Sequence, residues 1–430
     1  MKRVLIISPH YPPVNAADMH RVRHSLPYFK ELGWEAEVIA VDSKFVEANS
    51  LDELLLNGIP EDNKVHYVKA WEIHKARMFG LGSLSIRSFL HFRKKGNALL
   101  RSGKFDLVYF STTAFHVMAL GPYWQRKYKV PFILDIQDPW RNDFYLDKPK
   151  SERPPKFYLN YCIDKYLEKK TIPKATGIIS VSKGYNDIFL ERYSNLKPEK
   201  LTVIPFAASS ADFEIMHQHV RSFEPAAFTK DKTNIVYIGR GGHDLGYAIE
   251  ILFAAFEKGL KQHLTGFKNV HFWFLGTSYA PKGTGKQTIL PVAIKYGLEK
   301  YVTESPDRLT YFETLFLLEK ADILFVPGSV DKAYTASKLY PYILAKKPLF
   351  GIFYHTSSVV EVLKKTKAGD IICFETVEDP EQYIELCLNL LVKLISQKDW
   401  QVQTDWEAFE SYSAFSLTKA QVNFFEKVLS

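Results

Sequence analysis

Both halves of the sequence alternate short runs of β-branched and aromatic residues with longer amphipathic segments. This alternation is typical of parallel sheets covered by helices, because each parallel strand needs a crossover before the next one. The runs expected to form strands in the first half are residues 4–8, 35–41, 64–68, 105–110, 131–135, 176–180 and 201–205. In the second half they are residues 234–239, 270–276, 321–327, 348–352 and 370–374. The predicted fold class is therefore α/β, with two tandem doubly wound domains.

The boundary between these domains is expected in residues 206–232, which show no clear hydrophobic period. We predict an N-terminal Rossmann-like domain over residues 1–205 and a C-terminal one over residues 206–400. The helical pattern at 409–429 predicts that residues 401–430 form a C-terminal helix packing back on the first domain. Sheets of this kind bind ligands at the carboxyl ends of their strands, so two of them imply facing domains with a cleft between them.

Composition narrows the classes of partner. Three cysteines in 430 residues are too few for a disulfide framework, which favours a reducing compartment such as the cytoplasm. The opening apolar run is shorter than that of a signal peptide, and no apolar stretch reaches the roughly 18 residues of a membrane span. Lys and Arg (56) exceed Asp and Glu (48), which favours anionic partners. The charge is not concentrated in one domain, so we expect no nucleic acid.

The first turn, residues 8–23, is long, aromatic and rich in proline, which is unusual for a plain connector. Its small residues Asn15, Ala16 and Ala17 let a ligand approach the backbone near a helix N-terminus, and Arg21 adds positive charge. We expect Asp18 to be the N-cap of a helix over residues 18–32. The alternative is that the prolines only stiffen the connection and the arginine faces water.

Two later turns of the first domain carry candidate catalytic groups. His116 follows the strand at 105–110 and is a possible substrate contact, although a satisfied, partly buried histidine fits equally well. Asp138 follows the strand at 131–135, where it could accept a hydroxyl proton, and Trp140 beside it could stack on a sugar. The alternative makes Asp138 a loop-capping carboxylate.

In the second domain, a diphosphate clamp is the main site prediction. Gly239 and Gly241 flank Arg240 at a strand end, where glycines permit close backbone approach and arginine can bind phosphate with two donors. Ser337 and Lys338 begin a later helix and are expected to face the same ligand. The alternatives are a structural turn and a surface lysine. No Asp-x-Asp pair and no His-Glu-x-x-His motif occurs, so no metal site is expected.

Residues 71–101 mix basic side chains with bulky apolar ones. This mixture suits a helix lying on an anionic membrane surface, and it suits equally a core-facing helix with a solvated basic side. Both interpretations stay open at this stage.

Taken together, these motifs resemble a GT-B-fold glycosyltransferase of the family-4-like group over nearly the whole chain. The run SPHYPPVNAADMHRVRHSLPYFKELGWEAEVIAV (8–41) is similar to that group's first strand, donor–acceptor loop and second strand. The runs YIGRGG (237–242) and SKLYPYILAKKPLFGI (337–352) look like its phosphate-binding turn and Ser-Lys helix. The group's usual Gly-Gly in the first loop is Ala16-Ala17, and glutamates common in the group are replaced by Ala333 and Pro341.

The resemblance implies transfer of a hexose from a nucleotide-sugar donor to a glycan or lipid-linked acceptor, with retention at the anomeric carbon and with neither metal nor other cofactor. It implies an acceptor-binding first domain, a donor-binding second domain and a role in cell-surface polysaccharide synthesis at the inner membrane face. Arg240 and Lys338 would stabilise the leaving diphosphate, and Asp138 and His116 would orient the acceptor. The missing glutamates leave two alternatives: a nucleotide-sugar epimerase of GT-B fold and a non-catalytic glycan-binding relative.

Overall fold

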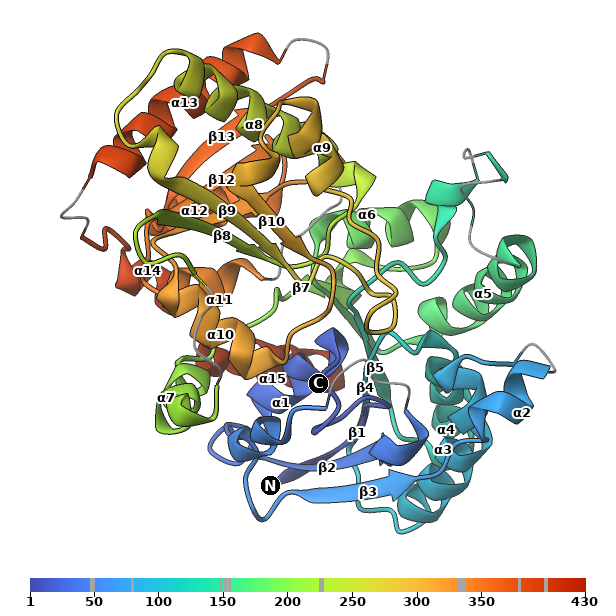
Figure 1. Ribbon diagram of the computed structural model, residues 1–430. Helices are drawn as coiled ribbons and strands as arrows, with labels where there is room; N and C mark the ends of the chain where they lie inside the picture. The colour runs from blue at the N-terminus through green and yellow to red at the C-terminus, as the bar shows by residue number, and fades with distance from the viewer. Residues whose placement is uncertain are drawn as a thin grey trace. The chain divides into compact units, whose positions relative to one another are not determined.

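The computed structural model in Figure 1 divides the chain into two compact units. Unit 1 comprises Met1–Ala207 and Ala414–Ser430, and unit 2 comprises Ala208–Ser413. The predicted boundary at residue 205 lies next to the first of these division points. The structure describes residues 1–46, 51–78, 81–146, 149–150, 153, 156–223, 228–330, 338–377, 380–397 and 401–430.

Unit 1 is built on a seven-stranded parallel sheet with the order β3-β2-β1-β4-β5-β6-β7. Its strands are β1 (Lys2–Ile7), β2 (Trp34–Val41), β3 (Lys64–Val68), β4 (Leu107–Ser111), β5 (Phe132–Ile136), β6 (Gly177–Ser180) and β7 (Leu201–Val203). All seven predicted strands are present. The order reverses direction beside β1, so the turns after β1 and β4 leave neighbouring strand ends at the switch point where such sheets bind ligands.

Helices and 3-10 turns connect these strands. They are η1 (Ala17–Met19), α1 (His20–Ser25), η2 (Ser43–Phe45), η3 (Glu53–Gly58), α2 (Ile73–Met78), α3 (Leu84–Leu100), η4 (Phe115–Ala119), α4 (Leu120–Tyr128), η5 (Asp143–Tyr145), α5 (Phe157–Thr171), η7 (Ile172–Lys174), α6 (Lys183–Arg192), η8 (Pro198–Lys200) and α15 (Ala414–Leu429). The first helix is shorter than predicted, and Asp18 lies inside η1 without capping a helix, because its carboxylate is bonded elsewhere.

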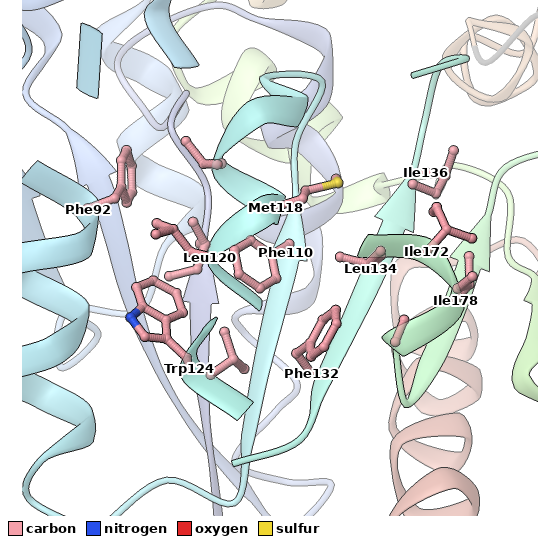
Figure 2. Close-up of a cluster of buried hydrophobic side chains, with 14 of the residues drawn as sticks. Phe92, Phe110, Met118, Leu120, Trp124, Phe132, Leu134, Ile136, Ile172 and Ile178 are labelled. Atoms are coloured by element: carbon pink, nitrogen blue, oxygen red, sulfur yellow. The ribbon is translucent and has the colours of Figure 1, made fainter. Parts of the chain in front are cut away.

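Successive residues of β1 alternate between two hydrophobic cores, as both faces of a parallel sheet are covered. Leu5 and Ile7 enter the core shown in Figure 2, where the Phe110 ring stacks at 5.8 Å on Trp124. A Cβ on Gly96 of α3 would collide with the Trp124 ring, so glycine allows that helix to approach closely. This packing fixes α3 and α4 against the sheet.

The other face of the unit 1 sheet is covered partly by α15, the last helix of the chain. Phe425 lies 5.6 Å from the Trp34 ring and 5.1 Å from the Tyr109 ring, and it is fully buried. Trp34 also donates a 2.9 Å hydrogen bond to Glu426. Residues 401–430 were predicted to act as one element on the first domain; in the structure 414–430 belong to unit 1 and 401–413 to unit 2.

Unit 2 contains a six-stranded parallel sheet with the order β10-β9-β8-β11-β12-β13. Its strands are β8 (Thr233–Ile238), β9 (Val270–Leu275), β10 (Val302–Ser305), β11 (Ile323–Pro327), β12 (Leu349–Tyr354) and β13 (Asp370–Phe374). Five were predicted, and β10 was missed because its sequence, VTES, is mostly polar. The two sheets confirm the predicted α/β class with two Rossmann-like domains.

The helical elements of unit 2 cover both faces of this sheet (Figure 1). They are α7 (Ser210–Gln218), η9 (Val220–Ser222), η10 (His243–Leu245), α8 (Gly246–Lys261), η11 (Phe267–Asn269), α9 (Leu290–Lys295), η12 (Glu299–Tyr301), α10 (Tyr311–Lys320), α11 (Leu339–Leu344), α12 (Ser358–Thr366), α13 (Glu381–Ser396) and α14 (Trp406–Glu410). The expected irregular connection at 206–232 is thus partly wrong, because α7 buries Phe213, Ile215 and Met216 within unit 2.

Candidate functional site

The turn after β8 carries the predicted phosphate-binding arginine. Arg240 donates two hydrogen bonds to Asp244, Nη1 to Oδ1 at 2.8 Å and Nη2 to Oδ2 at 2.6 Å. Burial alone would raise the pKa of Asp244, but the hydrogen bonds and charge of Arg240 lower it below its usual range. About a quarter of the Arg240 side chain is exposed. The guanidinium is therefore oriented by a carboxylate while remaining accessible.

Lys338, which immediately precedes α11, is the second predicted cation, and it lies against the same strand end. Its Nζ donates a 2.7 Å hydrogen bond to the Tyr237 hydroxyl and lies 4.8 Å from the centre of that ring. Burial and the positive charges of Arg240 and Arg308 lower the pKa of Lys338 to about 7, although Asp244 acts in the opposite direction. A nearby anion would therefore stabilise the charged form of Lys338 and raise its pKa.

The glycines around Arg240 leave space for this arrangement. A Cβ on Gly239 would overlap the Lys338 ammonium group and approach the Tyr237 hydroxyl, and a Cβ on Gly241 would collide with the hydroxyl of Thr288. Tyr237 in turn donates a 2.8 Å hydrogen bond to the carbonyl of Arg240. Gly239 and Gly241 thus allow the lysine and the loops to pack against the turn.

Arg308, just after β10, is a third cation that the sequence did not reveal. It donates a 2.9 Å hydrogen bond to the carbonyl of Gly276 and stacks over the Tyr279 ring at 4.6 Å. Gly276 follows Leu275, whose carbonyl accepts a 2.9 Å hydrogen bond from the Gly239 backbone, so Arg308 lies beside the Arg240 turn, and its charge helps to lower the pKa of Lys338. We call Arg240, Arg308 and Lys338 the cation cluster. Of the remaining predicted residues here, Ser337 lies outside the described residues, as does Ala333.

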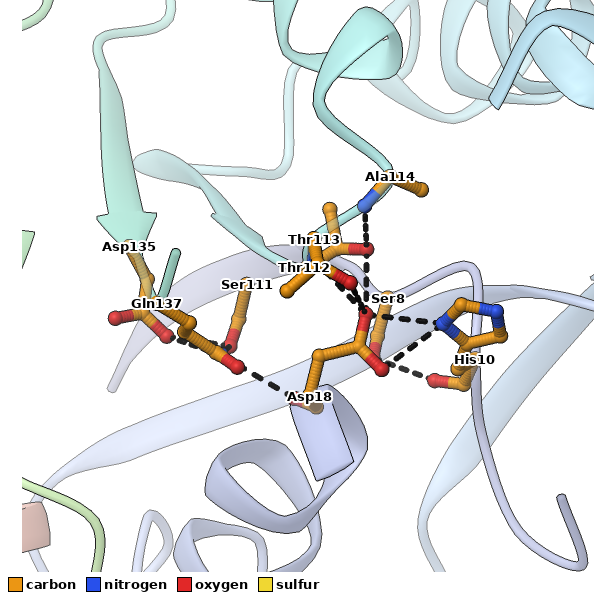
Figure 3. A network of polar contacts seen from close by, with 9 residues as sticks. All are labelled: Ser8, His10, Asp18, Ser111, Thr112, Thr113, Ala114, Asp135 and Gln137. Atoms are coloured by element: carbon orange, nitrogen blue, oxygen red, sulfur yellow. Dashed lines mark hydrogen bonds and ion pairs between the residues drawn. The ribbon is translucent and has the colours of Figure 1, made fainter. Parts of the chain in front are cut away.

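In unit 1, the turn after β1 forms a buried polar network around Asp18 (Figure 3). Asp18 accepts hydrogen bonds from the Thr113 backbone at 2.9 Å and from the hydroxyl of Thr112 at 3.0 Å, and it pairs with His10 Nδ1 at 2.9 Å. Burial raises the pKa of Asp18 but the charge and hydrogen bonds of these partners outweigh it and lower the pKa to about 2.

The histidine of this pair is the part of the network that reaches the surface. Burial lowers the pKa of His10, but Asp18 raises it by a larger amount, so the net shift favours the imidazolium. About a fifth of the ring is exposed, and Figure 3 shows its second nitrogen directed away from Asp18. Sequence reasoning missed His10, although its place directly after β1 was a usable signal.

Arg21 and Asp135 serve the fold of unit 1, which corrects the prediction that Arg21 faces a ligand. Arg21 is buried, with its Nε 2.8 Å from Asp135 Oδ2 and its two terminal nitrogens donating to the carbonyls of Ile204 and Pro205. Gln137 donates a 2.7 Å hydrogen bond to the same carboxylate (Figure 3). The Arg21 guanidinium is thus held by groups of unit 1.

The two predicted catalytic residues have different surroundings. His116 contacts protein groups with both ring nitrogens, Ser85 Oγ at 2.6 Å and Asp164 at 3.2 Å, which favours its structural interpretation. Asp138 is exposed on the turn after β5. Trp140 does not face a ligand as expected, because it is buried and stacked on Phe115 at 5.8 Å.

The predicted small-residue loop is accessible. Asn15 and Ala16 are half-buried, and Ala17 is exposed at the start of η1. Among the described residues, no group of three or more His, Cys, Asp or Glu side chains could hold a metal ion. Within the same residues, no helix has the length and apolar character needed to span a bilayer.

The basic segment 71–101 is divided by the structure. In α3 the Phe92 side chain is buried and Arg87 is too, donating to the carbonyls of Phe45 and Trp71 at 3.1 and 2.8 Å. Arg93 and Lys94 on the same helix are exposed. Most of α3 therefore corresponds to the core-facing helix with a solvated basic side.

Comparisons with known proteins agree with this fold. Residues 20–207 match the sequence model of Glycosyltransferase Family 4. No curated protein sequence gives a significant match. Among solved structures, the chain is similar to HepE from Anabaena in complex with UDP, with TM-score 0.57 and 14% identity, over 99% of this chain and 100% of that one.

Two further structures are similar along their whole length. WaaG, a glycosyltransferase involved in lipopolysaccharide biosynthesis, matches with TM-score 0.57 and 14% identity over 98% of each chain. A UDP-forming trehalose-phosphate synthase from Burkholderia xenovorans matches with TM-score 0.59 and 11% identity over 100% of each chain. The predicted resemblance to GT-B proteins of the family-4-like group is confirmed.

Proposed function

From a GT-B fold whose first unit carries the Glycosyltransferase Family 4 pattern, we propose that this protein transfers a sugar from a nucleotide diphosphate donor to an acceptor hydroxyl. The cation cluster beside the carboxyl ends of β8 and β10 is the observation that carries this proposal. The relatives support the same class of donor, because HepE has been crystallised with UDP and with UDP-glucose.

The cation cluster would bind the diphosphate. As the bond between the anomeric carbon and the diphosphate oxygen breaks, negative charge develops on the leaving group, and fixed cations stabilise it. Arg240 offers two donors in a plane, which suits phosphate oxygens. Lys338 would become fully protonated when the diphosphate arrives, since the anion offsets the repulsion by Arg240 and Arg308.

Unit 1 would bind the acceptor, a glycan or a lipid-linked sugar. The acceptor oxygen forms the new bond to the anomeric carbon, and its proton passes to an oxygen of the departing diphosphate if the configuration is retained. His10 directly follows β1 and is the group of unit 1 best placed to orient a hydroxyl, because Asp18 fixes the position of its ring. Asp138 and the loop at Asn15 would assist, whereas His116 would position other side chains.

We further propose that the donated sugar is a hexose and that the reaction needs no metal ion or other cofactor. The protein would act in cell-surface polysaccharide synthesis, in the cytoplasm and at the inner membrane face. The clearest competing function is glycan binding without turnover, favoured by Pro341 in α11 where related enzymes carry a glutamate.

The experiment that tests this proposal supplies several radiolabelled nucleotide sugars, with and without membrane extract as a source of acceptor. Labelled product that forms only with the extract supports transfer. Interconversion of the nucleotide sugar without extract would instead assign an epimerase. Binding without any turnover would assign the glycan-binding alternative.

A further inference from the structure

Unit 1 contains a cavity of about 280 Å³ where β6 and β7 begin. Thr176 directly precedes β6, and Lys200 directly precedes β7. In a parallel sheet all strands begin at one edge, so this cavity lies at the edge opposite His10, which follows the end of β1. The cavity, which we call the lysine pocket, is lined by the polar residues Gln125, Lys174, Thr176, Glu199, Lys200 and Lys427.

The helix α15 forms one wall of the lysine pocket. A Cβ on Gly177 would lie 2.8 Å from the Phe424 ring and 3.3 Å from Val428, so the end of α15 passes directly over the start of β6. Val428 and Lys427 of this helix line the pocket. The other lining residues belong to α4, to η8 and to the segment before β6. The pocket therefore joins α15 to the body of unit 1.

The positive charges of the lysine pocket are not matched by acids. Among the residues that the structure describes, Lys174, Lys200 and Lys427 form no ion pair with a carboxylate. The acid of the pocket, Glu199, lies 3.9 Å from the ammonium group of Lys197, which is not a lining residue. Three cations thus line the pocket together with one carboxylate that has another partner.

The lining also offers hydrogen-bond donors. Lys200 Nζ donates to the carbonyl of Ala175 at 3.3 Å, and an ammonium group has three donors. Gln125 Nε2 donates to Thr176 Oγ1 at 3.5 Å, and its amide has a second N–H. Lys200, Gln125 and Thr176 are half-buried, so the walls hold them more firmly than free surface side chains. This lining suits a ligand rich in acceptor oxygens.

We propose that the lysine pocket binds a small phosphate-bearing anion and that this anion holds α15 against the start of β6 and β7. A phosphate group carries nearly two negative charges at neutral pH and several acceptor oxygens, and lysine is a common partner of phosphate in proteins. Small-molecule sites span roughly 300–1,000 Å³. The volume of about 280 Å³ therefore fits phosphate or a hexose phosphate and is too small for a nucleotide sugar.

The expected consequence is a ligand-dependent stability of unit 1. An anion that contacts Lys427 together with Lys174 or Lys200 links segments that lie far apart in the sequence. A ligand that binds only the folded state stabilises it by mass action. Opening of α15 should therefore become rarer when the pocket is occupied. The inference does not depend on the proposed transfer reaction.

Calorimetric titration of the full chain with inorganic phosphate, and separately with glucose 6-phosphate, tests the proposal. The background variant Arg240→Ala/Lys338→Ala removes binding at the cation cluster, and both probes should still bind to it. In this background, Lys174→Gln/Lys427→Gln should weaken binding about tenfold or more. Glu199→Gln should strengthen it about threefold, because it removes a negative charge beside the anion. Tighter binding of glucose 6-phosphate would assign a sugar phosphate, and equal affinities would assign free phosphate.

A matched control lies in the same unit. Lys69→Gln/Lys104→Gln alters exposed lysines outside the lysine pocket and should bind both probes like the background variant. Thermal unfolding without ligand checks the fold, which substitutions of the exposed Lys174 and Lys427 should leave intact. The site is wrong if neither probe binds to the background variant, or if Lys174→Gln/Lys427→Gln binds them like the control.

Hydrogen exchange tests the effect on α15 separately. At saturating glucose 6-phosphate the backbone amides of α15 should exchange about tenfold more slowly, because the bound anion opposes local opening of the helix. The same amides in Lys174→Gln/Lys427→Gln should not respond to this concentration. Binding without slower exchange in α15 would overturn the proposed effect on the helix.

Discussion

The side chains at the carboxyl ends of the strands are balanced in charge in one sheet and unbalanced in the other. In unit 1 the charged groups at the strand ends are matched: Asp18 with His10 and two threonines, and Arg21 with Asp135. In unit 2 the cation cluster sets three positive side chains against the one carboxylate of Asp244 that acts on Lys338. The charges at the strand ends of unit 1 balance one another, whereas those in unit 2 would be stabilised by an added anion.

This difference predicts that the charged residues of unit 1 contribute mainly to folding stability and those of unit 2 mainly to ligand binding. Buried ion pairs that satisfy one another add rigidity, and removing one partner leaves the other unpaired. A buried cation without a matching anion destabilises the free protein, and a bound anionic ligand offsets that destabilisation. Substitutions at the strand ends of unit 1 should therefore change the free energy of unfolding, and those in unit 2 should change ligand affinity.

The largest effect is expected for Asp18→Ala. Removing the carboxylate leaves buried donors and His10 without their acceptor, which should lower the free energy of unfolding by about 3–5 kcal/mol. Because the pKa of Asp18 is lowered to about 2, its contribution is present above pH 4 and is lost as the pH falls towards 2. Urea unfolding measures the change. Asp138→Ala, at an exposed site, should leave unfolding nearly unaltered.

The cation cluster should behave in the reverse manner. Arg240→Ala and Lys338→Ala should each weaken binding of UDP by about 10–100-fold, because each removes a charge-assisted hydrogen bond to phosphate. Neither should destabilise the protein as Asp18→Ala does. Calorimetric titration with UDP measures the affinity, with Lys268→Ala as the control. Unaltered affinity in both variants would remove the site assignment.

His10 and His116 allow an accessible and a structurally paired histidine of unit 1 to be compared. His10→Gln should lower kcat/KM for the acceptor by about tenfold, because an orienting hydrogen bond to a charged group is lost. His116→Gln should lower it less than about threefold, since His116 faces Ser85 and Asp164. Initial rates at varied acceptor concentration provide the test. Equal losses in the two variants would contradict the assignment.

The smallest expected effect is a dependence of UDP affinity on pH. The pKa of Lys338 is about 7 in the free protein and should rise when the diphosphate binds, so binding takes up a proton above pH 7. Affinity should fall several-fold between pH 7 and 8, and Lys338→Met should remove the Lys338 part of this slope. Titrations in two buffers of different ionisation enthalpy count the proton. Equal proton uptake in the variant would exclude Lys338 as its source.

Hydrophobic periodicity predicted most of the fold, because buried parallel strands consist mainly of apolar residues. It missed β10, which contains the buried polar residue Glu304. The Glu304 carboxylate accepts hydrogen bonds from the backbone of Ile289 and Leu290 at the start of α9. Without β10, Arg308 had no assigned strand end and could not be placed in the site. Lys338 and Arg240 were found because glycines and a helix start surround them.

The residues whose roles were misjudged share a different cause. Arg21 and Trp140 are side chains common in binding sites, and nothing local shows that they are buried. Their partners, the carbonyl of Ile204 for Arg21 and the ring of Phe115 for Trp140, lie far from them along the chain. Such long-range partners depend on the tertiary fold, which one sequence alone does not reveal.

The final helix gives the chain an order of assembly. Unit 2 is one continuous stretch, whereas unit 1 needs α15, which follows all of unit 2 in the sequence, to cover Trp34 and Tyr109. During synthesis the first half must wait with an apolar surface open to solvent while the second half is already complete. Truncation just before α15 would thus damage the beginning of the protein more than its middle.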